Sequence, residues 1–202
     1  QIKSRKEDYR FLTGSGIYTA DLVHNRQTTG VVVRSPHAHA RILSIDTAEA
    51  ESNPGVVTIL TSDDIEAAGL GTIPCLHDPM EELGSNMITP PRHLLATKYV
   101  RHVGEPVAFV VAETAAQAQD AAELIEIEYE VLPSITNAKL ATAPDAPRLW
   151  PNAQSNTSFI WEKGDRHATD ALFETAHHVV KLDLINNRLV SNPMEPRNAT
   201  GI

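Results

Sequence analysis

The clearest hydrophobic pattern along the chain begins at residue 107. Residues 107–112 form an unbroken apolar run, which is typical of a central strand that is buried on both faces. Thr114-Ala115-Ala116-Gln117 has the spacing of a helix capping box. The helix that follows carries an apolar stripe made of Ala118, Ala121, Ala122 and Ile125.

Strict alternation of apolar and acidic residues comes next and predicts a half-buried strand. One face of this strand carries Ile127, Tyr129 and Val131, and the other carries Glu126, Glu128 and Glu130. Strand, helix and strand at this spacing are typical of a split βαβ-type unit. The region therefore predicts a mixed sheet with packed helices.

Residues 28–66 predict two strands, a short helix and a third strand. The predicted elements are the strands Thr29–Arg34 and 41–46, the helix 48–52 and the strand Val56–Leu60. Asn53-Pro54-Gly55 separates the helix from the third strand, and Ser62-Asp63-Asp64 offers cap residues for one more short helix.

The remaining segments are less regular. Residues 1–16 are a polar arm, which Phe11, Leu12 and the following Ile17 are expected to dock onto the protein. Residues 67–97 contain many glycines and prolines and predict a long loop, and residues 136–164 predict a linker. Beyond the linker, Asp165 is expected to cap a helix whose inward side carries Ala168, Ala171 and Leu172. Residues 179–189 then predict a long strand that needs neighbours.

Charge and composition narrow the function classes. The formal net charge of -9 argues against a basic surface for nucleic acid. The single cysteine excludes an internal disulfide, and it falls short of the roughly four ligands of an iron–sulfur cluster or structural zinc site. The chain has no apolar run of about 18 residues and no signal-peptide pattern. We therefore expect a cytoplasmic protein without a membrane span.

Several short motifs contain residue types that could form a site. His37 and His39 share a face if the backbone is extended, but two histidines are an incomplete ligand set, and a strand-end turn set by Pro36 is the simpler interpretation. His177 and His178 would face opposite ways on a strand, so that one is a packing residue.

The glycines and the cysteine give weaker signals. Gly14-x-Gly16 and Gly69-x-Gly71 lack the third glycine and the flanking strand and helix of a dinucleotide loop. Cys75 has no nucleophile signature around it, so an incidental or buried thiol is the expected reading.

Two glutamates that precede a proline remain as candidate sites. Gly104-Glu105-Pro106 precedes the predicted central strand and indicates a structural turn, with a supporting role beside a cofactor as the alternative. Glu195 lies between Pro193 and Pro196, which would aim its carboxylate reproducibly. It is expected to brace the structure, through an ion pair with Arg197 or with a residue elsewhere, or to support a cofactor pocket.

An ordered series of motifs resembles a known family. The motifs are RKEDYRFLTG at 5–14, YTAD at 18–21, VRSPHAHARI at 33–42, PGV at 54–56, VGEPVA at 103–108, EYEVLP at 128–133, NRLV at 187–190 and NPMEPR at 192–197. In this order they resemble the N-terminal part of the molybdopterin-binding large subunit of the xanthine dehydrogenase, aldehyde oxidase and aerobic carbon monoxide dehydrogenase superfamily. The NPMEPR motif is the most specific of them.

The resemblance implies an α+β fold and a division of the chain. Residues 17–135 would form the family's α/β hammerhead domain, and residues 165–202 would begin the first molybdopterin-binding domain. The full enzyme would hydroxylate or oxidise a small carbon centre with water as the oxygen source. Its partners would be the remaining molybdopterin-binding region, an iron–sulfur subunit and an FAD subunit.

The family's catalytic parts are not matched in this sequence. Its glycine-rich cofactor loop, active-site glutamine and catalytic glutamate are expected beyond Ile202, so no catalytic, cofactor-binding or metal-binding residue is assigned. This chain alone is expected to be inactive and to bind no molybdenum. Two alternatives stay open, namely a complete small structural subunit of a split large subunit and an unrelated α+β binding module.

Overall fold

The chain divides into two compact units. The computed structural model describes residues 5–76, 87–187, 189–193, 195 and 197–201. One unit is Thr28–Lys163, and the other joins Gln1–Gln27 to Gly164–Ile202. In the described part of the chain, no helix has the length and apolar character needed to cross a membrane.

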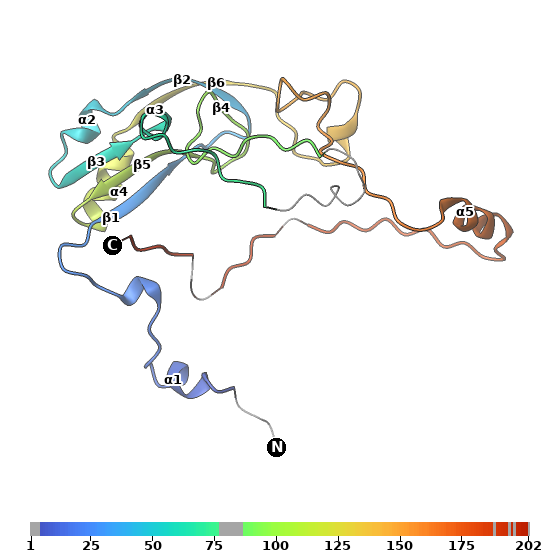
Figure 1. Cartoon of the computed structure of the whole chain (residues 1–202), viewed down its shortest axis with the longest axis horizontal. Helices are drawn as coiled ribbons and strands as arrows, with labels where there is room; N and C mark the ends of the chain where they lie inside the picture. The colour runs from blue at the N-terminus through green and yellow to red at the C-terminus, as the bar shows by residue number, and fades with distance from the viewer. Residues whose placement is uncertain (1–4, 77–86, 188, 194, 196, 202) are drawn as a thin grey trace. The chain divides into compact units, whose positions relative to one another are not determined.

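Two antiparallel sheets of three strands each form the framework of unit Thr28–Lys163 (Figure 1). The first sheet has the order β1-β5-β3, with bounds Thr29–Arg34, Pro106–Ala112 and Val56–Leu60. The second has the order β4-β2-β6, with bounds Tyr99–Val100, Ala40–Asp46 and Glu126–Val131. In the first sheet, Val110 of β5 lies opposite both Val31 and Ile59, so apolar side chains form a row across all three strands.

Helix α4, Ala115–Glu123, packs on the β1-β5-β3 sheet. The Thr114 hydroxyl begins the helix by accepting a hydrogen bond from Gln117 N at 3.3 Å, as the sequence predicts. Ala118 and Ala121 are fully buried, and their small side chains let the helix approach the sheet closely. The resulting core cluster comprises Ala50, Ile59, Ala108, Val110, Ala112, Ala118, Ala121 and Ile125.

A second core cluster lies beside the other sheet and comprises Ala40, Ala96, Val100 and Val107. Ile45 of β2 and Ile127 of β6 pack against both clusters, so the two halves of the core are continuous through these residues. Their contacts connect the two sheets without a shared strand. The predicted face of β6 is only partly correct, because Ile127 and Tyr129 are half-buried while Val131 is 65% exposed.

The α+β class and the strands of this unit are confirmed, but the predicted βαβ-type unit is wrong. β5 and β6 flank α4 in sequence but belong to different sheets, and each pairs antiparallel with its neighbours. The strands thus form two antiparallel sheets in place of one mixed sheet. Local periodicity identified every strand of this unit except the two-residue β4, whereas the choice of partner depends on contacts with β1, β2 and β3, which lie far away in sequence.

The described residues of this unit also form three short helices: α2 Ala48–Glu51, α3 Ser62–Ala67 and η3 Leu140–Thr142. The predicted cap of α3 is off by one residue, because Thr61 is the cap and Thr61 N donates to Asp64 Oδ2 at 2.7 Å. The hydrogen bonds from Thr61 hold the pKa of Asp64 below its usual value. Within the predicted loop 67–97, the described residues pair at one bridge, Ile73 with Arg92, and residues 77–86 lie outside the described chain.

The other unit contains little buried surface. Its helices are α1 Asp8–Leu12, η1 Thr19–Asp21 and α5 Arg166–Thr175, and none of them has a buried residue. The predicted cap of α5 is confirmed, since Ala168 N donates to Asp165 Oδ1 at 2.8 Å. The predicted inward side is wrong, because Leu172 is 71% exposed. The arm residues Leu12 and Ile17 are exposed as well, and Phe11 stacks on Tyr18 at 6.1 Å.

The strand predicted at 179–189 is also wrong for the described residues of that range, none of which belongs to a strand. Its alternation is real, but a strand needs a hydrogen-bonded neighbour, and none of the described strands pairs with it. Val180 and Leu184 are therefore 90% and 81% exposed.

Gly30 provides a test of packing on β5. A Cβ at this position would lie 2.2 Å from Phe109 Cζ on the neighbouring strand, so Gly30→Ala must displace the ring. We expect the free energy of unfolding to fall by about 1–3 kcal/mol, measured by urea denaturation.

Gly71→Ala is the matched control for this prediction. A Cβ there meets no atom within 4 Å, so its free energy of unfolding should stay within roughly 0.5 kcal/mol of the parent chain. The double variant Gly30→Ala/Phe109→Leu replaces the ring with a smaller side chain and should recover part of the lost stability. Equal effects of the two alanine substitutions would contradict the proposed clash.

Candidate functional site

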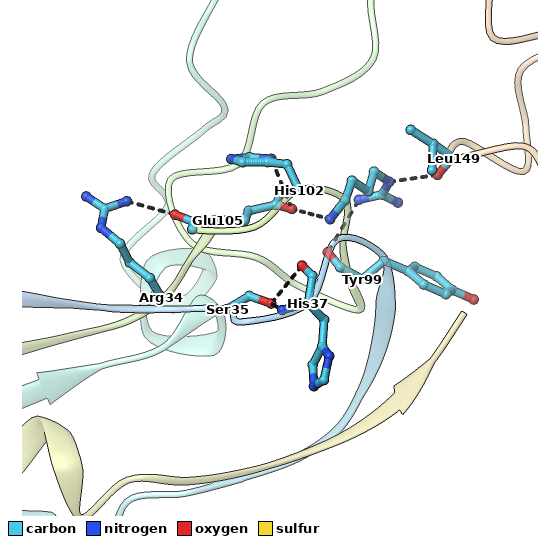
Figure 2. Close-up of polar contacts among 9 residues, drawn as sticks. Arg34, Ser35, His37, Tyr99, His102, Glu105 and Leu149 are labelled. Atoms are coloured by element: carbon cyan, nitrogen blue, oxygen red, sulfur yellow. Dashed lines mark hydrogen bonds and ion pairs between the residues drawn. The ribbon is translucent and has the colours of Figure 1, made fainter. Parts of the chain in front are cut away.

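A set of polar contacts in unit Thr28–Lys163 lies where two turns meet at the start of β5. One turn is residues 34–37, after β1, and the other is residues 101–106, before β5; together they are called the paired turns. Ser35 N donates to Glu105 O at 2.9 Å, and Gly104 N donates to Ser35 O at 2.8 Å. The Arg34 guanidinium adds a bond to Gly104 O at 2.8 Å (Figure 2). Gly104 has a φ of 84°, a left-handed conformation that glycine adopts without strain.

Ser35 and the two histidines define the first turn. The Ser35 hydroxyl accepts a hydrogen bond from His37 N at 3.0 Å and lies 3.2 Å from His37 O, to which it donates. His39 is buried, and its Nδ1 lies 2.7 Å from Pro133 O. The His37 ring instead packs edge-on against Tyr129 at 4.9 Å. The turn predicted at Pro36 is therefore present, and the two imidazoles have different neighbours.

Glu105 organises the second turn. Its side chain is 19% exposed, and its carboxylate accepts a hydrogen bond from the backbone N of Arg101. The same carboxylate oxygen lies 3.5 Å from His102 Nδ1, an exposed imidazole that forms an ion pair when protonated. The carboxylate thus closes the loop that leads into Pro106.

Arg101 connects the second turn to the segment that the sequence predicts as a linker. Its guanidinium stacks 3.6 Å from the centre of the Trp150 ring and lies 5.4 Å from that of Tyr99. Its Nε donates to Leu149 O at 2.9 Å (Figure 2). Burial lowers the pKa of Arg101, and the nearby Glu105 charge opposes this change. These contacts hold Leu149 and Trp150 against Arg101 of the second turn.

Asn156 gives this segment an internal structure. Its side-chain nitrogen donates to Ala141 O and Pro147 O, both at 3.1 Å, and its side-chain oxygen accepts from Leu149 N at 3.2 Å. Three stretches of backbone are thereby joined by one amide. The division of the chain at residues 136–164 stays a prediction, but this part of the segment is folded.

One unsatisfied group lies on β6, next to the His37 ring of the first turn. The Tyr129 hydroxyl is buried and has no hydrogen-bond partner among the described residues. Burial raises the pKa of Tyr129, and Ser35 lies near enough to oppose this rise without reaching hydrogen-bond geometry. The neutral hydroxyl is therefore the favoured form.

The other candidate residues from the sequence do not belong to the paired turns. His177 and His178 are exposed, with ring centres 6.3 Å apart, and Cys75 is exposed. Gly14 and Gly69 have φ values of 70° and 69° and serve as turn residues. In the described part of the chain, no three His, Cys, Asp or Glu side chains gather where they could hold one metal ion.

Glu195 does make a long-range contact. Its Oε1 accepts a hydrogen bond from Thr19 N at 3.1 Å, and Arg197 is exposed. Met194 and Pro196, which complete the motif, lie outside the described residues. The expectation that Glu195 braces other parts of the chain thus has one observed contact.

Sequence reasoning missed Arg101, Trp150, Asn156 and the hydroxyls of Ser35 and Tyr129. The available signal was a tryptophan within a Pro- and Ala-rich segment, since a large aromatic ring there implies a packing partner. Chemically, the backbone and side-chain groups of the paired turns are engaged with one another. They can fix loops in place, and they include no nucleophile hydrogen-bonded to a base.

This arrangement defines a class of protein: a small α+β scaffold domain of the hammerhead type, whose loops are fixed against one another at the start of a buried strand. The chain belongs to the aldehyde oxidase and xanthine dehydrogenase family. The family model described as "Aldehyde oxidase and xanthine dehydrogenase, a/b hammerhead domain" matches residues 13–133. The family and fold that the sequence motifs imply are thereby confirmed.

Molybdenum enzymes are among its relatives. The carbon monoxide dehydrogenase large chain of Afipia carboxidovorans is 36% identical over 205 residues, covering 96% of this chain and 24% of that protein. The nicotine 6-hydroxylase large subunit of Paenarthrobacter nicotinovorans is 38% identical over 198 residues, covering 96% and 23%. A solved carbon monoxide dehydrogenase from Oligotropha carboxidovorans superimposes with a TM-score of 0.72 at 36% identity, covering 87% and 22%. The chain thus spans about a quarter of the length of these relatives.

The hydroxyls of Ser35, in the first turn, and Tyr129, on β6, should respond in opposite ways to removal. Ser35→Ala deletes the group that ties the turn to His37 and should lower the free energy of unfolding by about 1 kcal/mol. Tyr129→Phe removes an unpartnered hydroxyl and should leave that free energy unchanged or raise it. Urea denaturation at pH 7 measures both.

The alkaline limb of stability gives an independent check on Tyr129. Because its pKa is raised in the folded state, the unfolded chain loses this proton first, and stability falls as the pH rises above about 10. Tyr129→Phe should make that decline shallower. A clear loss of stability at pH 7 would instead mean that the hydroxyl has a partner.

The contact between Arg101 and Trp150 should give a measurable coupling energy in a double-mutant cycle. Arg101→Lys keeps the charge but loses the planar stack and the Nε donor to Leu149, so we expect a loss of about 1 kcal/mol. In a cycle with Trp150→Leu, the double variant should lose less than the sum of the singles, by roughly 0.5–1 kcal/mol. Arg41→Lys, in an ion pair with both side chains about half exposed, is the control and should change stability by less than about 0.5 kcal/mol. Additive losses would contradict the coupling.

Proposed function

We propose that the chain is a scaffold portion of a molybdenum hydroxylase large subunit. The observation that carries the proposal is the extent of similarity: identity to the carbon monoxide dehydrogenase large chain covers 96% of the chain, well past the hammerhead match at 13–133. The similarity therefore includes the apolar segment 179–190. In the whole subunit, this segment would be covered by other parts of the enzyme.

The complete enzyme would oxidise or hydroxylate a small carbon centre, with water as the oxygen source, in the cytoplasm. The molybdenum–molybdopterin cofactor supplies the redox chemistry when bound. Electrons would pass to iron–sulfur clusters and FAD on partner subunits or domains. The role of this chain's own residues is positional: the paired turns and the Arg101–Trp150 contact hold loops in fixed places.

Among the described residues, no three His, Cys, Asp or Glu side chains gather where they could hold one metal ion, and we assign none of these residues to the cofactor. Burial of Arg101 and the engagement of Ser35, Glu105 and His39 in internal contacts also leave these groups committed to the fold. We propose that the cofactor is held by the remaining molybdopterin-binding region. This chain alone would then be inactive.

Native purification tests the proposal. The polypeptide that carries this sequence should be isolated from its own host, and the same sample analysed for assembly mass, molybdenum, iron and flavin. We expect the polypeptide to co-purify with molybdenum, iron and flavin in a multi-subunit assembly. The mass of the polypeptide itself distinguishes a segment of a large subunit from a separate small subunit.

The 202-residue chain expressed alone is the matched comparison, in a host that makes the cofactor. We expect its unit Thr28–Lys163 to fold and the chain to retain no stoichiometric molybdenum. Stoichiometric molybdenum on this chain would contradict the assignment of the cofactor to other regions. A metal-free native polypeptide with no partners would contradict the proposed function as a whole.

A further inference from the structure

The N-terminal arm has its own local structure. The rings of Phe11 and Tyr18 are stacked, with an interplanar angle of 13°. Gly16 permits this, because a Cβ there would lie 2.7 Å from Phe11 Cδ1. Tyr18 N donates to Asp21 Oδ2 at 2.8 Å, which closes the turn η1. The arm therefore presents a defined backbone.

One amide of this turn has its partner far away in sequence. Within η1, Tyr18 N is bonded to the Asp21 side chain, and Asp21 N donates to Tyr18 O at 2.9 Å. Thr19 N donates instead to Glu195 Oε1 at 3.1 Å, across 176 residues of sequence. Backbone amides strongly favour an acceptor, and a bond to an ionised carboxylate is stronger than a neutral one.

The position of Glu195 suits this contact. Pro193 lies two residues before it and restricts the local backbone, which limits the directions that the carboxylate can take. The arm and the Glu195 segment belong to the same compact unit, while Thr28–Lys163 forms the other. The hydrogen bond is therefore internal to one unit.

We propose that Glu195 is a positioning residue that fixes the N-terminal arm, residues 5–27, by accepting the hydrogen bond from the Thr19 amide. On this view the arm is a structural part of the unit that contains α5. The carboxylate acts through the Thr19 amide. This proposal concerns the chain itself and does not rest on the proposed function.

Amide hydrogen exchange on the native assembly tests the proposal. In the parent protein the Thr19 amide should be protected, and Glu195→Ala should speed its exchange by roughly threefold to tenfold, as expected for loss of one hydrogen bond. Glu195→Gln retains an acceptor oxygen in the same place. It should therefore restore most of the protection.

Glu174→Ala is the matched control. It removes an exposed carboxylate from α5 in the same unit and should leave Thr19 exchange unchanged. Tryptic cleavage after Arg10 should rise in Glu195→Ala alone. Equal exchange at Thr19 in Glu195→Ala and the parent would overturn the proposal, as would failure of Glu195→Gln to rescue it. Because exchange is read on the polypeptide itself, the result is independent of the molybdenum content that tests the proposed function.

Discussion

The fold depends on the burial of β5, in which Pro106, Phe109 and Val111 are half-buried and the other residues are fully buried. This strand is hydrogen-bonded along both edges, to β1 and β3, and its residues supply both core clusters. Val107 belongs to one cluster, whereas Ala108, Val110 and Ala112 belong to the other, and all four are fully buried. The backbone N–H and C=O groups of a buried strand cannot bond to water. The strand must therefore begin where other protein groups satisfy them.

The paired turns fulfil that requirement. Pro106 begins β5 without an amide hydrogen, and its carbonyl accepts from Ala96 N at 2.7 Å, so the first residue of the strand is already satisfied. Gly104 and Glu105 are bonded to the backbone of Ser35, which immediately follows the neighbouring strand β1. The family motifs around residues 35 and 105 thus meet in space for a backbone reason, and no catalytic role is needed to explain their pattern.

The sequence predicted what depends on local periodicity and could not predict what depends on distant partners. The run at 107–112 and the alternation after Glu126 located β5 and β6 because burial imposes a period on the residues. The same alternation at 179–189 wrongly predicted a strand. An alternating pattern indicates one apolar face, but it gives no information about whether a neighbouring strand is present. The Arg101–Trp150 stack was invisible for a related reason: it pairs residues 49 positions apart, with no spacing rule between them.

The two units differ in what stabilises them. In Thr28–Lys163, apolar side chains are buried around β5 and polar turns are paired, so this unit has a core of its own. The other unit has helices without buried residues and an apolar stretch whose Leu182 and Ile185 are 77% and 86% exposed. Exposed apolar surface of this extent is unfavourable in water and marks an interaction surface. Its hydrogen bonds, including Thr19 to Glu195, can orient the backbone, but its described residues bury too little apolar surface to contribute much stability.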